Sequence, residues 1–276
     1  MMKDLLIPDE ISAILKKLTD SSYEAYLVGG CVRDFLLGKE VKDFDISTNA
    51  KPEEVKAVFS GYRVIETGID HGTLTVIIDR IPAEVTTFRS DGEYFDHRRP
   101  SEVIFTDCVT EDLSRRDFTI NAMALNRDGG ILDPFGGRDD LREGIIRCVG
   151  DPRRRFAEDS LRIMRGMRFA CVTGFSIEGN TAGSMKKHKD LLNAVSAERI
   201  GKEFMEMICG DKVEGILTEF RDIIGTIIPE LKASFDFDQR NPHHCYDIYT
   251  HSVKTAAALP ADPLLRMAGQ IGRAHV

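Results

Sequence analysis

Two acidic residues, Asp43 and Asp45, flank Phe44 in the segment KDFDIST. Alternate side chains of a β-strand point to the same face, so we expect both carboxylates to project together and Phe44 to turn into the core. Two ionised carboxylates repel each other unless a divalent cation lies between them, as in a two-metal phosphoryl-transfer site. The alternative is a solvated Asp-x-Asp on an edge strand. A third acid, Glu84, opens the β-rich run EVTTF, where a neighbouring strand can present it to the same ions.

A Gly-Gly turn precedes this acidic pair. A β-rich run ends in Gly29 and Gly30 and leads directly into a helical pattern. Because glycine has no Cβ, the N–H groups at such a helix start can approach an anion closely. The P-loop spacing G-x-x-x-x-G-K-[ST] is missing, so the turn alone favours a plain strand-to-helix connection. Arg33 follows in the first helical turn, and Arg116 lies in EDLSRRDFTINAMAL; a guanidinium suits phosphate oxygens. For Arg115, surface charge is the favoured interpretation.

A third candidate site is the helical pattern RRRFAEDSLRIMRGMRFA, residues 153–170, which concentrates positive charge and favours a polyanion. Its six arginines are Arg153, Arg154, Arg155, Arg162, Arg165 and Arg168, and its two acids are Glu158 and Asp159. Asp159 and Arg162 are three residues apart, hence adjacent on one helix, and the simplest interpretation is an ion pair worth about 0.2 to 0.5 kcal/mol. The same three-residue spacing continues through Arg165 and Arg168. On one helix these four residues would form a row that winds around the axis instead of a straight stripe.

The same Asp–Arg pair can also distinguish nucleobases. Cytosine and adenine each present an amino donor beside an unprotonated ring nitrogen, which a carboxylate and a guanidinium complement. Uracil and guanine reverse that pattern. With either base, buried polar groups would stay unpaired, and each unpaired group costs about 1 to 3 kcal/mol of binding free energy. Asp159 with Arg162 therefore favours CTP and ATP without a nucleic-acid template.

Short strand and helix patterns alternate up to about residue 150, and helical periodicity alone continues from residue 151. The runs TLTVII and AEVTTF are separated by DRIP, a break suited to a hairpin, so the sheet is expected to be mixed. The predicted fold class is α+β: a head with a mixed sheet over residues 1–150, followed by an all-α region.

Composition narrows the function classes. The 276 residues carry a formal net charge of −8, which excludes a generically basic nucleic-acid coat. Successive members of the six cysteines lie more than 20 residues apart, so there is no C-x-x-C motif, and a reducing cytoplasm is favoured. No stretch approaches eighteen consecutive apolar residues, so no membrane association is expected.

Seven segments, taken together and in order, resemble the motifs of class II tRNA nucleotidyltransferases, the CCA-adding enzymes and their poly(A) polymerase relatives. These segments are GGCVRD, DFDIST, EVTTFR, RRDFTINAMA, DPFGG, EDSLRIMRGMRFA and AERIGKEF. The resemblance covers residues 24 to about 210. It implies a polymerase-β-like nucleotidyltransferase head, a helical neck over 151–235, and a partial body that grips the tRNA acceptor end.

The resemblance also implies an activity and a role for each residue. A tRNA 3′-hydroxyl would attack the α-phosphate of CTP or ATP, and pyrophosphate would leave. The metal ligands for Mg²⁺ would be Asp43 and Asp45, with Glu84 as the third catalytic carboxylate. The phosphate-binding residues would be Gly30, Arg33 and Arg116. The base would be read by Asp159 and Arg162, with Arg165 and Arg168 completing the nucleotide site.

Alternatives within and outside the family remain. The stretch over residues 89–102 resembles the flexible loop that CC-only enzymes lack, so CC-only activity is disfavoured. The basic signature of bacterial poly(A) polymerases is missing from VTGFSIEGNT. Full CCA addition is therefore the first expectation, and A-only addition or poly(A) synthesis is second. A non-catalytic RNA-binding protein would have no reason to keep the three acids together.

The C-terminal part resembles the opening of an HD-type phosphohydrolase module, which we expect to be truncated within residues 236–269. His251 resembles the first metal ligand of such a module, and His243, His244 and Asp247 lie near it in the sequence. The defining His-Asp pair is missing, so surface or helix-cap roles are favoured over metal binding. Residues 270–276 resemble the translation of a sequencing adapter, and we expect a non-native tail there.

Overall fold

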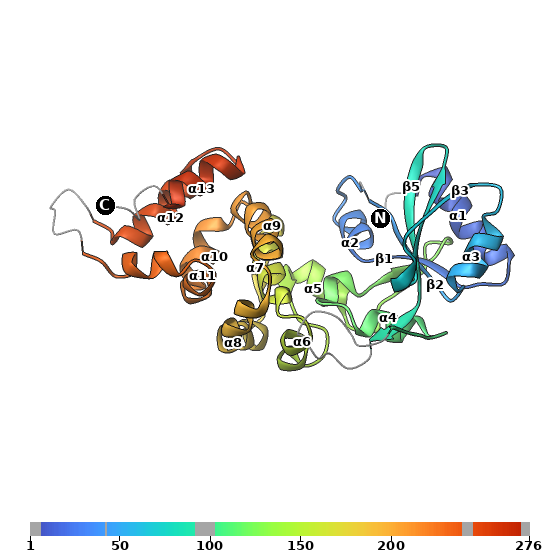
Figure 1. Ribbon diagram of the computed structural model, residues 1–276, viewed down its shortest axis with the longest axis horizontal. Coiled ribbons are helices and arrows are strands. Elements are labelled where there is room, and N and C mark those ends of the chain that lie inside the picture. The colour runs from blue at the N-terminus through green and yellow to red at the C-terminus, as the bar shows by residue number, and fades with distance from the viewer. Residues whose placement is uncertain (1–6, 42, 92–102, 239–244, 272–276) are drawn as a thin grey trace. The chain divides into compact units, whose positions relative to one another are not determined.

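The computed structural model describes residues 7–41, 43–91, 103–238 and 245–271. These residues form two compact units that divide between Glu143 and Gly144, a head and a helical unit (Figure 1). We predicted this boundary near residue 150. It lies earlier because β10 (Ile145–Ile146) pairs in parallel with β11 (Ser176–Ile177) and so belongs with the helices. This pairing of two residues per strand is an exception to the helical second half that we predicted.

The head is built on a mixed seven-stranded sheet of order β3-β4-β5-β2-β1-β8-β9. Its strands are β1 (Ala25–Val28), β2 (Asp45–Thr48), β3 (Arg63–Gly68), β4 (Thr73–Ile78), β5 (Ile81–Thr87), β8 (Ala124–Leu125) and β9 (Ile131–Leu132). The pair β2 and β5 is parallel, and the other neighbouring pairs are antiparallel. The predicted mixed sheet is thus confirmed. A separate two-stranded sheet contains β6 (Arg89–Asp91) and β7 (Val103–Phe105).

The predicted hairpin is formed by β4 and β5. Its turn residues, Asp79 and Arg80, have φ values of +46° and +73°, the left-handed conformation that matches the twist of tightly connected strands. Along β4 the side chains of Leu74, Val76 and Ile78 are buried and alternate with half-buried neighbours. This alternation gives the sheet one core-facing side and fixes the register of the hairpin.

Helices complete the head around the sheet. They are α1 (Asp9–Asp20), α2 (Gly30–Leu36), α3 (Pro52–Val58), α4 (Val109–Ser114) and α5 (Gly137–Glu143), with short 3-10 turns η1 (Ile69–His71) and η2 (Thr119–Asn121). In α1 the residues Ile11, Ile14, Leu15 and Leu18 are fully buried, as expected for one apolar face at helical spacing. That face packs against α3, β1 and β4.

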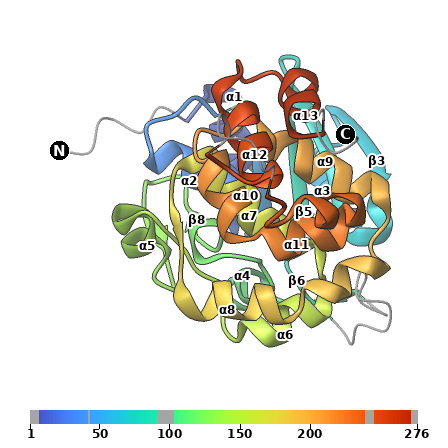
Figure 2. The same ribbon diagram turned by 90° about the vertical axis from the view of Figure 1, so that its left-hand side faces the viewer.

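The second unit is mainly helical. Its elements are α6 (Pro152–Glu158), α7 (Leu161–Thr173), α8 (Gly179–Lys187), η3 (Lys189–Ala194), α9 (Ala197–Ile208), α10 (Val213–Glu219), α11 (Arg221–Ile227), η4 (Pro229–Ser234), α12 (Ile248–Ala258) and α13 (Pro263–Ile271). Helix α7 packs against α9. Helix α6 packs against α8, and the two lie together at the lower edge of Figure 2. Most of α7 is buried. It is therefore the central helix of this unit.

The expected neck and C-terminal module lie in the same compact unit. Helix α12 packs on α10, and α13 packs on both α12 and α9. The buried Arg266 of α13 donates to the carbonyl oxygens of Ile208 (2.9 Å) and Gly210 (3.0 Å). Because these carbonyls end α9, one guanidinium both caps that helix and fixes α13 to it.

Asp247 has the helix-cap role that we favoured. Its carboxylate accepts hydrogen bonds from the Thr250 backbone N–H (2.9 Å) and from the Thr250 hydroxyl (2.7 Å) at the start of α12. His243 and His244, and residues 272–276 of the suspected tail, lie outside the described residues. Within the described parts of the chain, no helix has both the length and the apolar character needed to cross a membrane.

Candidate active site

Two of the predicted acids, Asp45 and Glu84, lie side by side where the parallel pairing of β2 with β5 begins. Asp45 opens β2, and the register of the parallel pair places it opposite Glu84 on β5. The backbone N–H of Glu84 donates to the carbonyl oxygen of Phe44 (2.9 Å). A neighbouring strand therefore presents Glu84 beside Asp45, as predicted. Phe44 is only half-buried, contrary to our expectation, because β2 starts at Asp45 and strand alternation does not extend back to Phe44 or to the exposed Asp43.

The electrostatics of Asp45 favour a cation. Burial raises the pKa of its carboxyl group, and the negative charges of Glu84 and Asp43 raise it further. The guanidinium of Arg116 opposes this shift and does not cancel it. The ionised carboxylate is therefore disfavoured by its surroundings, and additional positive charge at this position would stabilise it.

Divalent metal ions are the cations that this donor set suits. Across residues 7–41, 43–91, 103–238 and 245–271, no group of three or more His, Cys, Asp or Glu side chains could hold a metal ion. The three acids thus do not form a ready three-carboxylate ligand set. Mg²⁺ is usually held by one or two protein carboxylates, with water and substrate phosphates completing its shell. The carboxylates of Asp43 and Asp45 fit that pattern.

Gly29 makes room for a guanidinium beside Asp45. It joins β1 to α2 with φ +76°, and a Cβ there would lie 2.8 Å from Arg116 Nη1 and 3.6 Å from Asp45 Oδ2. The Nε atom of Arg116 is buried and has no hydrogen-bond partner among the described residues. An anionic ligand that accepted from this group would remove the cost of an unpaired buried donor.

We predict that Gly29→Ala lowers both stability and nucleotide transfer. The positive φ costs a non-glycine residue about 1 to 3 kcal/mol, and the new methyl group would displace Arg116. Gly38→Ala is the matched control, because Gly38 also has a positive φ (+67°) and a Cβ there meets no atom within 4 Å. Thermal unfolding should show comparable losses for both variants, and the transfer rate should fall at least about tenfold only for Gly29→Ala. Equal transfer rates would contradict this placement of Arg116.

Arg33 lies in the first turn of α2, which Gly30 opens. Its Nη1 donates to Asn121 Oδ1 (2.9 Å), and its Nε and Nη2 donate to the carboxylate of Asp34 (2.9 and 2.8 Å). The amide of Asn121 is itself fixed by a bond from its Nδ2 to Asp117 Oδ1 (3.2 Å). Arg33 is thus oriented by the segment that follows Arg116, a link that the sequence did not predict.

A residue that sequence reasoning missed, Asp112, anchors the arginines of this segment. Its carboxylate is fully buried, and it accepts from Arg115 Nε (3.0 Å) and Nη2 (2.8 Å) and from Arg116 Nη2 (3.5 Å). It also accepts from Ser47 Oγ on β2 (3.3 Å) and from the Arg89 N–H (3.4 Å). Arg115 is therefore part of a buried ion pair, and the surface-charge interpretation was wrong. Asp112 precedes Arg115 by three residues and Arg116 by four, and this helical spacing could have identified it as their partner from the sequence.

The arginine-rich segment is not one helix. It breaks between α6 and α7 at Asp159, whose φ of −139° and ψ of 102° are extended. The Asp159 carbonyl accepts from the Arg162 N–H (3.1 Å), and its Oδ1 accepts from the Leu161 N–H (3.2 Å). The predicted continuous row through Asp159 is therefore wrong, because Asp159 follows the last residue of α6 and α7 begins only at Leu161. Arg162 is buried on α7, and its Nη1 donates to Glu158 Oε2 (3.1 Å).

Acidic residues of α9 offset part of the predicted positive patch. Arg168 donates through Nε to Glu203 Oε2 and lies 3.3 Å through Nη1 from Glu206 Oε2. Arg165 Nη1 is 3.8 Å from Glu203 Oε1. The guanidinium of Arg168 also lies over the Phe169 ring, 4.2 Å from its centroid. The prediction counted only the acids within residues 153–170, and so overestimated the local charge.

The chain is similar to known proteins over most of its length. Residues 25–147 match a family model described as the poly A polymerase head domain, and residues 174–234 match the probable RNA and SrmB-binding site of polymerase A. The chain is 46% identical over 222 residues to the CCA-adding enzyme of Enterococcus faecalis, covering 79% of this chain and 54% of that protein. The chain belongs to the tRNA nucleotidyltransferase and poly(A) polymerase family.

Solved structures of this family support the fold. The Bacillus stearothermophilus CCA-adding enzyme in complex with CTP superposes with a TM-score of 0.72 at 39% identity, covering 80% of this chain and 53% of that chain. The Thermotoga maritima CCA-adding enzyme complexed with tRNA_CCA gives a TM-score of 0.68 at 23% identity over 92% of this chain and 58% of that one, a likeness of fold alone. The predicted polymerase-β-like nucleotidyltransferase fold is confirmed. The chain spans about half the length of the curated relatives that it matches.

Proposed function

We propose that this chain catalyses template-independent transfer of CMP and AMP from CTP and ATP to the 3′ end of tRNA. The observation that carries the proposal is the parallel register that sets Asp45 opposite Glu84, with Arg116 close enough to act on the Asp45 pKa. Carboxylates for cations and guanidinium groups for phosphates are the two components that phosphoryl transfer requires. Curated relatives at 43–47% identity that are named CCA-adding enzymes support the choice of substrates.

Within this proposal each head residue has a defined task. Asp43 and Asp45 would hold Mg²⁺, with Glu84 as the third carboxylate. When bound, the ion would supply charge neutralisation at the phosphates and would acidify the attacking 3′-hydroxyl. Arg33, Arg116 and the α2 start at Gly30 would orient the triphosphate. Catalysis then depends on positioning and electrostatics, and no covalent enzyme intermediate is needed.

The helical unit would supply the choice of base. The Asp159 carboxylate accepts the amino group of cytosine or adenine, and the Arg162 guanidinium donates to the adjacent ring nitrogen. Arg165 and Arg168 complete the nucleotide site.

All six cysteines are free thiols, which supports the cytoplasm as the place of this reaction.

The test incubates the chain and Mg²⁺ with labelled CTP and ATP, separately and together, and with tRNAs that end in the discriminator base, C or CC. We expect two CMP additions followed by one AMP addition, and loss of transfer on chelation with EDTA. AMP addition to CC-ended tRNA alone would show an A-adding enzyme, and long A tracts would show a poly(A) polymerase. RNA binding without metal-dependent release of pyrophosphate would contradict an enzymatic function.

A further inference from the structure

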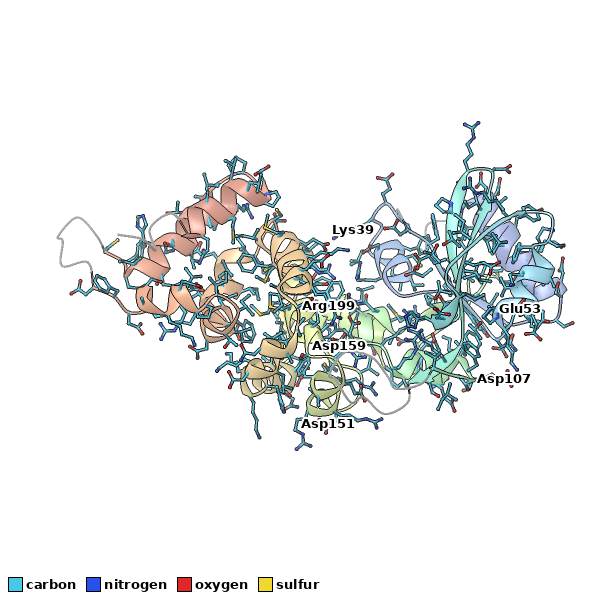
Figure 3. The ribbon with its side chains drawn as sticks, viewed as in Figure 1. Lys39, Glu53, Asp107, Asp151, Asp159 and Arg199 are labelled. Atoms are coloured by element: carbon cyan, nitrogen blue, oxygen red, sulfur yellow. The ribbon has the colours of Figure 1, made fainter. Side chains whose placement is uncertain are left out.

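Arg199 of α9 contacts the carboxylate expected to read the base. Its Nη2 lies 3.5 Å from Asp159 Oδ1 and 3.4 Å from Asp159 Oδ2, and both residues are labelled in Figure 3. The exposed fraction of the side chain is 26% for Arg199 and 19% for Asp159. Partial burial reduces the screening of their charges by water, so the pair is stronger than one on the open surface.

The contacts fix the plane of the Asp159 carboxylate. Its Oδ1 accepts from the Leu161 N–H at the start of α7 (3.2 Å), while Arg199 approaches both oxygens from α9. An ionised carboxylate has about four acceptor sites. Acceptor capacity therefore remains for a ligand, and the direction in which it points is set from two helices.

Arg199 has little else to do in the fold. Among the described residues, Asp159 is its only hydrogen-bond or ion-pair partner. Its Nη1 is buried with no partner in the same described part of the chain. A guanidinium kept for stability would pair its buried donors, because each unpaired one costs about 1 to 3 kcal/mol. The pattern is that of a side chain retained for what it does to Asp159.

We infer that Arg199 is a positioning residue that sets Asp159 for the selection of cytosine and adenine, an inference that rests on the proposed function. A carboxylate held in one orientation accepts the amino group of the correct base and repels the carbonyl oxygen that uracil or guanine presents there. A carboxylate free to rotate discriminates less, because it can turn away from the wrong base. Arg199 thereby determines specificity without touching the base.

The experiment measures kcat/KM for each of the four nucleoside triphosphates on tRNAs ending in C and in CC. For Arg199→Met we expect the preference for CTP and ATP over UTP and GTP to fall about tenfold or more. Arg199→Lys keeps a charge near Asp159 and should retain part of the preference. In a double-mutant cycle, adding Arg199→Met to Asp159→Asn should cost little further selectivity, because both changes remove the same interaction.

The control is Arg142→Met, which removes an exposed Arg–Asp pair, Arg142 with Asp139 (3.0 Å), and should leave selectivity unchanged. If the unsubstituted chain shows no preference for CTP and ATP, the proposed function is contradicted and this inference falls with it. If it shows the preference, and both Arg199 variants keep it or slow all four nucleotides equally, the inference alone is overturned. Use of the lysine variant keeps the test decisive even where the methionine variant unfolds.

Discussion

Asp45→Asn is expected to lower nucleotide transfer at least about 10³-fold while the head remains folded and becomes no less stable. The carboxylate is the metal-binding group of the proposed site, and an amide cannot replace its charge. The substitution is not expected to reduce stability as it reduces activity. Burial is the largest cause that raises the pKa of the Asp45 carboxyl group, and the charges of Glu84 and Asp43 raise it further. At neutral pH the folded protein therefore bears the cost of an unfavourable ionised group, and asparagine removes that cost.

The pH dependence of stability tests this assignment. A raised pKa means that the folded state holds its proton more tightly than the unfolded state, so the contribution of Asp45 is most favourable below the unfolded pKa of about 3.9. It becomes less favourable as the pH rises through the folded pKa. The melting temperature of Asp45→Asn should thus equal or exceed that of the unsubstituted chain at pH 7. The advantage should shrink on acidification.

Asp70→Asn is the control for Asp45→Asn, because Asp70 is exposed on η1 and should change neither property. Thermal unfolding and transfer of labelled CMP are measured on the same preparations. A variant of Asp45 that transfers within tenfold of the unsubstituted rate would remove Asp45 from the reaction. A melting temperature several degrees lower would show that the carboxylate holds the fold together.

Local patterns predicted most of the head. The hairpin of β4 and β5 was predictable because strand alternation and the charge-and-proline break DRIP are properties of neighbouring residues. The sequence could suggest that Asp45 and Glu84 lie on neighbouring strands, but it could not predict that they pair, because the register depends on how β5 docks beside β2. A sequence pattern carries no information about that register until one buried face is assigned.

The helical unit shows why the rest was missed. The break at Asp159 has a local signal, since Asp and Ser before an apolar run favour a helix start. The helical spacing of the apolar residues Phe156, Ile163 and Met167 nevertheless favoured one continuous helix. No local sequence signal identified the partners of Arg168 and Asp159 on α9. Glu203 and Arg199 lie on α9, some 35 to 40 residues from the side chains that they contact, and only packing brings them there.

Asp112→Asn should produce the largest loss of stability among the single changes considered. Breaking a buried ion pair by neutralising one partner costs about 3 to 5 kcal/mol. Asparagine has no charge to offer Arg115 and Arg116, and its NH₂ group replaces one of the two oxygens that accept from them and from Ser47 of β2. The loss has a functional consequence, because Arg116 is held between Asp112 and the site of Asp45. We therefore expect kcat/KM for CTP and ATP to fall about 10² -fold, the cost of a misplaced phosphate-binding group.

The sign of the pH effect is opposite to that for Asp45. Burial by itself raises the pKa of Asp112, but the charges of Arg115 and Arg116, with their hydrogen bonds, hold it below the ordinary value. The group stabilises the fold above the unfolded pKa of about 3.9, and this contribution is lost as the pH falls through the folded pKa. The difference in unfolding free energy between Asp112→Asn and the unsubstituted chain should therefore be largest near neutral pH and should decrease below about pH 4.

Urea unfolding between pH 7 and pH 3 measures this difference, and transfer kinetics well below the melting temperature measure the effect on Arg116. Asp139→Asn is the matched control, because Asp139 pairs with Arg142 at the same three-residue spacing as Asp112 with Arg115 and is exposed. It should change neither stability nor kcat/KM. If Asp112→Asn unfolds at the same urea concentration as this control, the buried carboxylate does not anchor the segment. If it is destabilised but keeps the unsubstituted kcat/KM, Arg116 is positioned by Gly29 and Asp45 alone, and Asp112 serves only the fold.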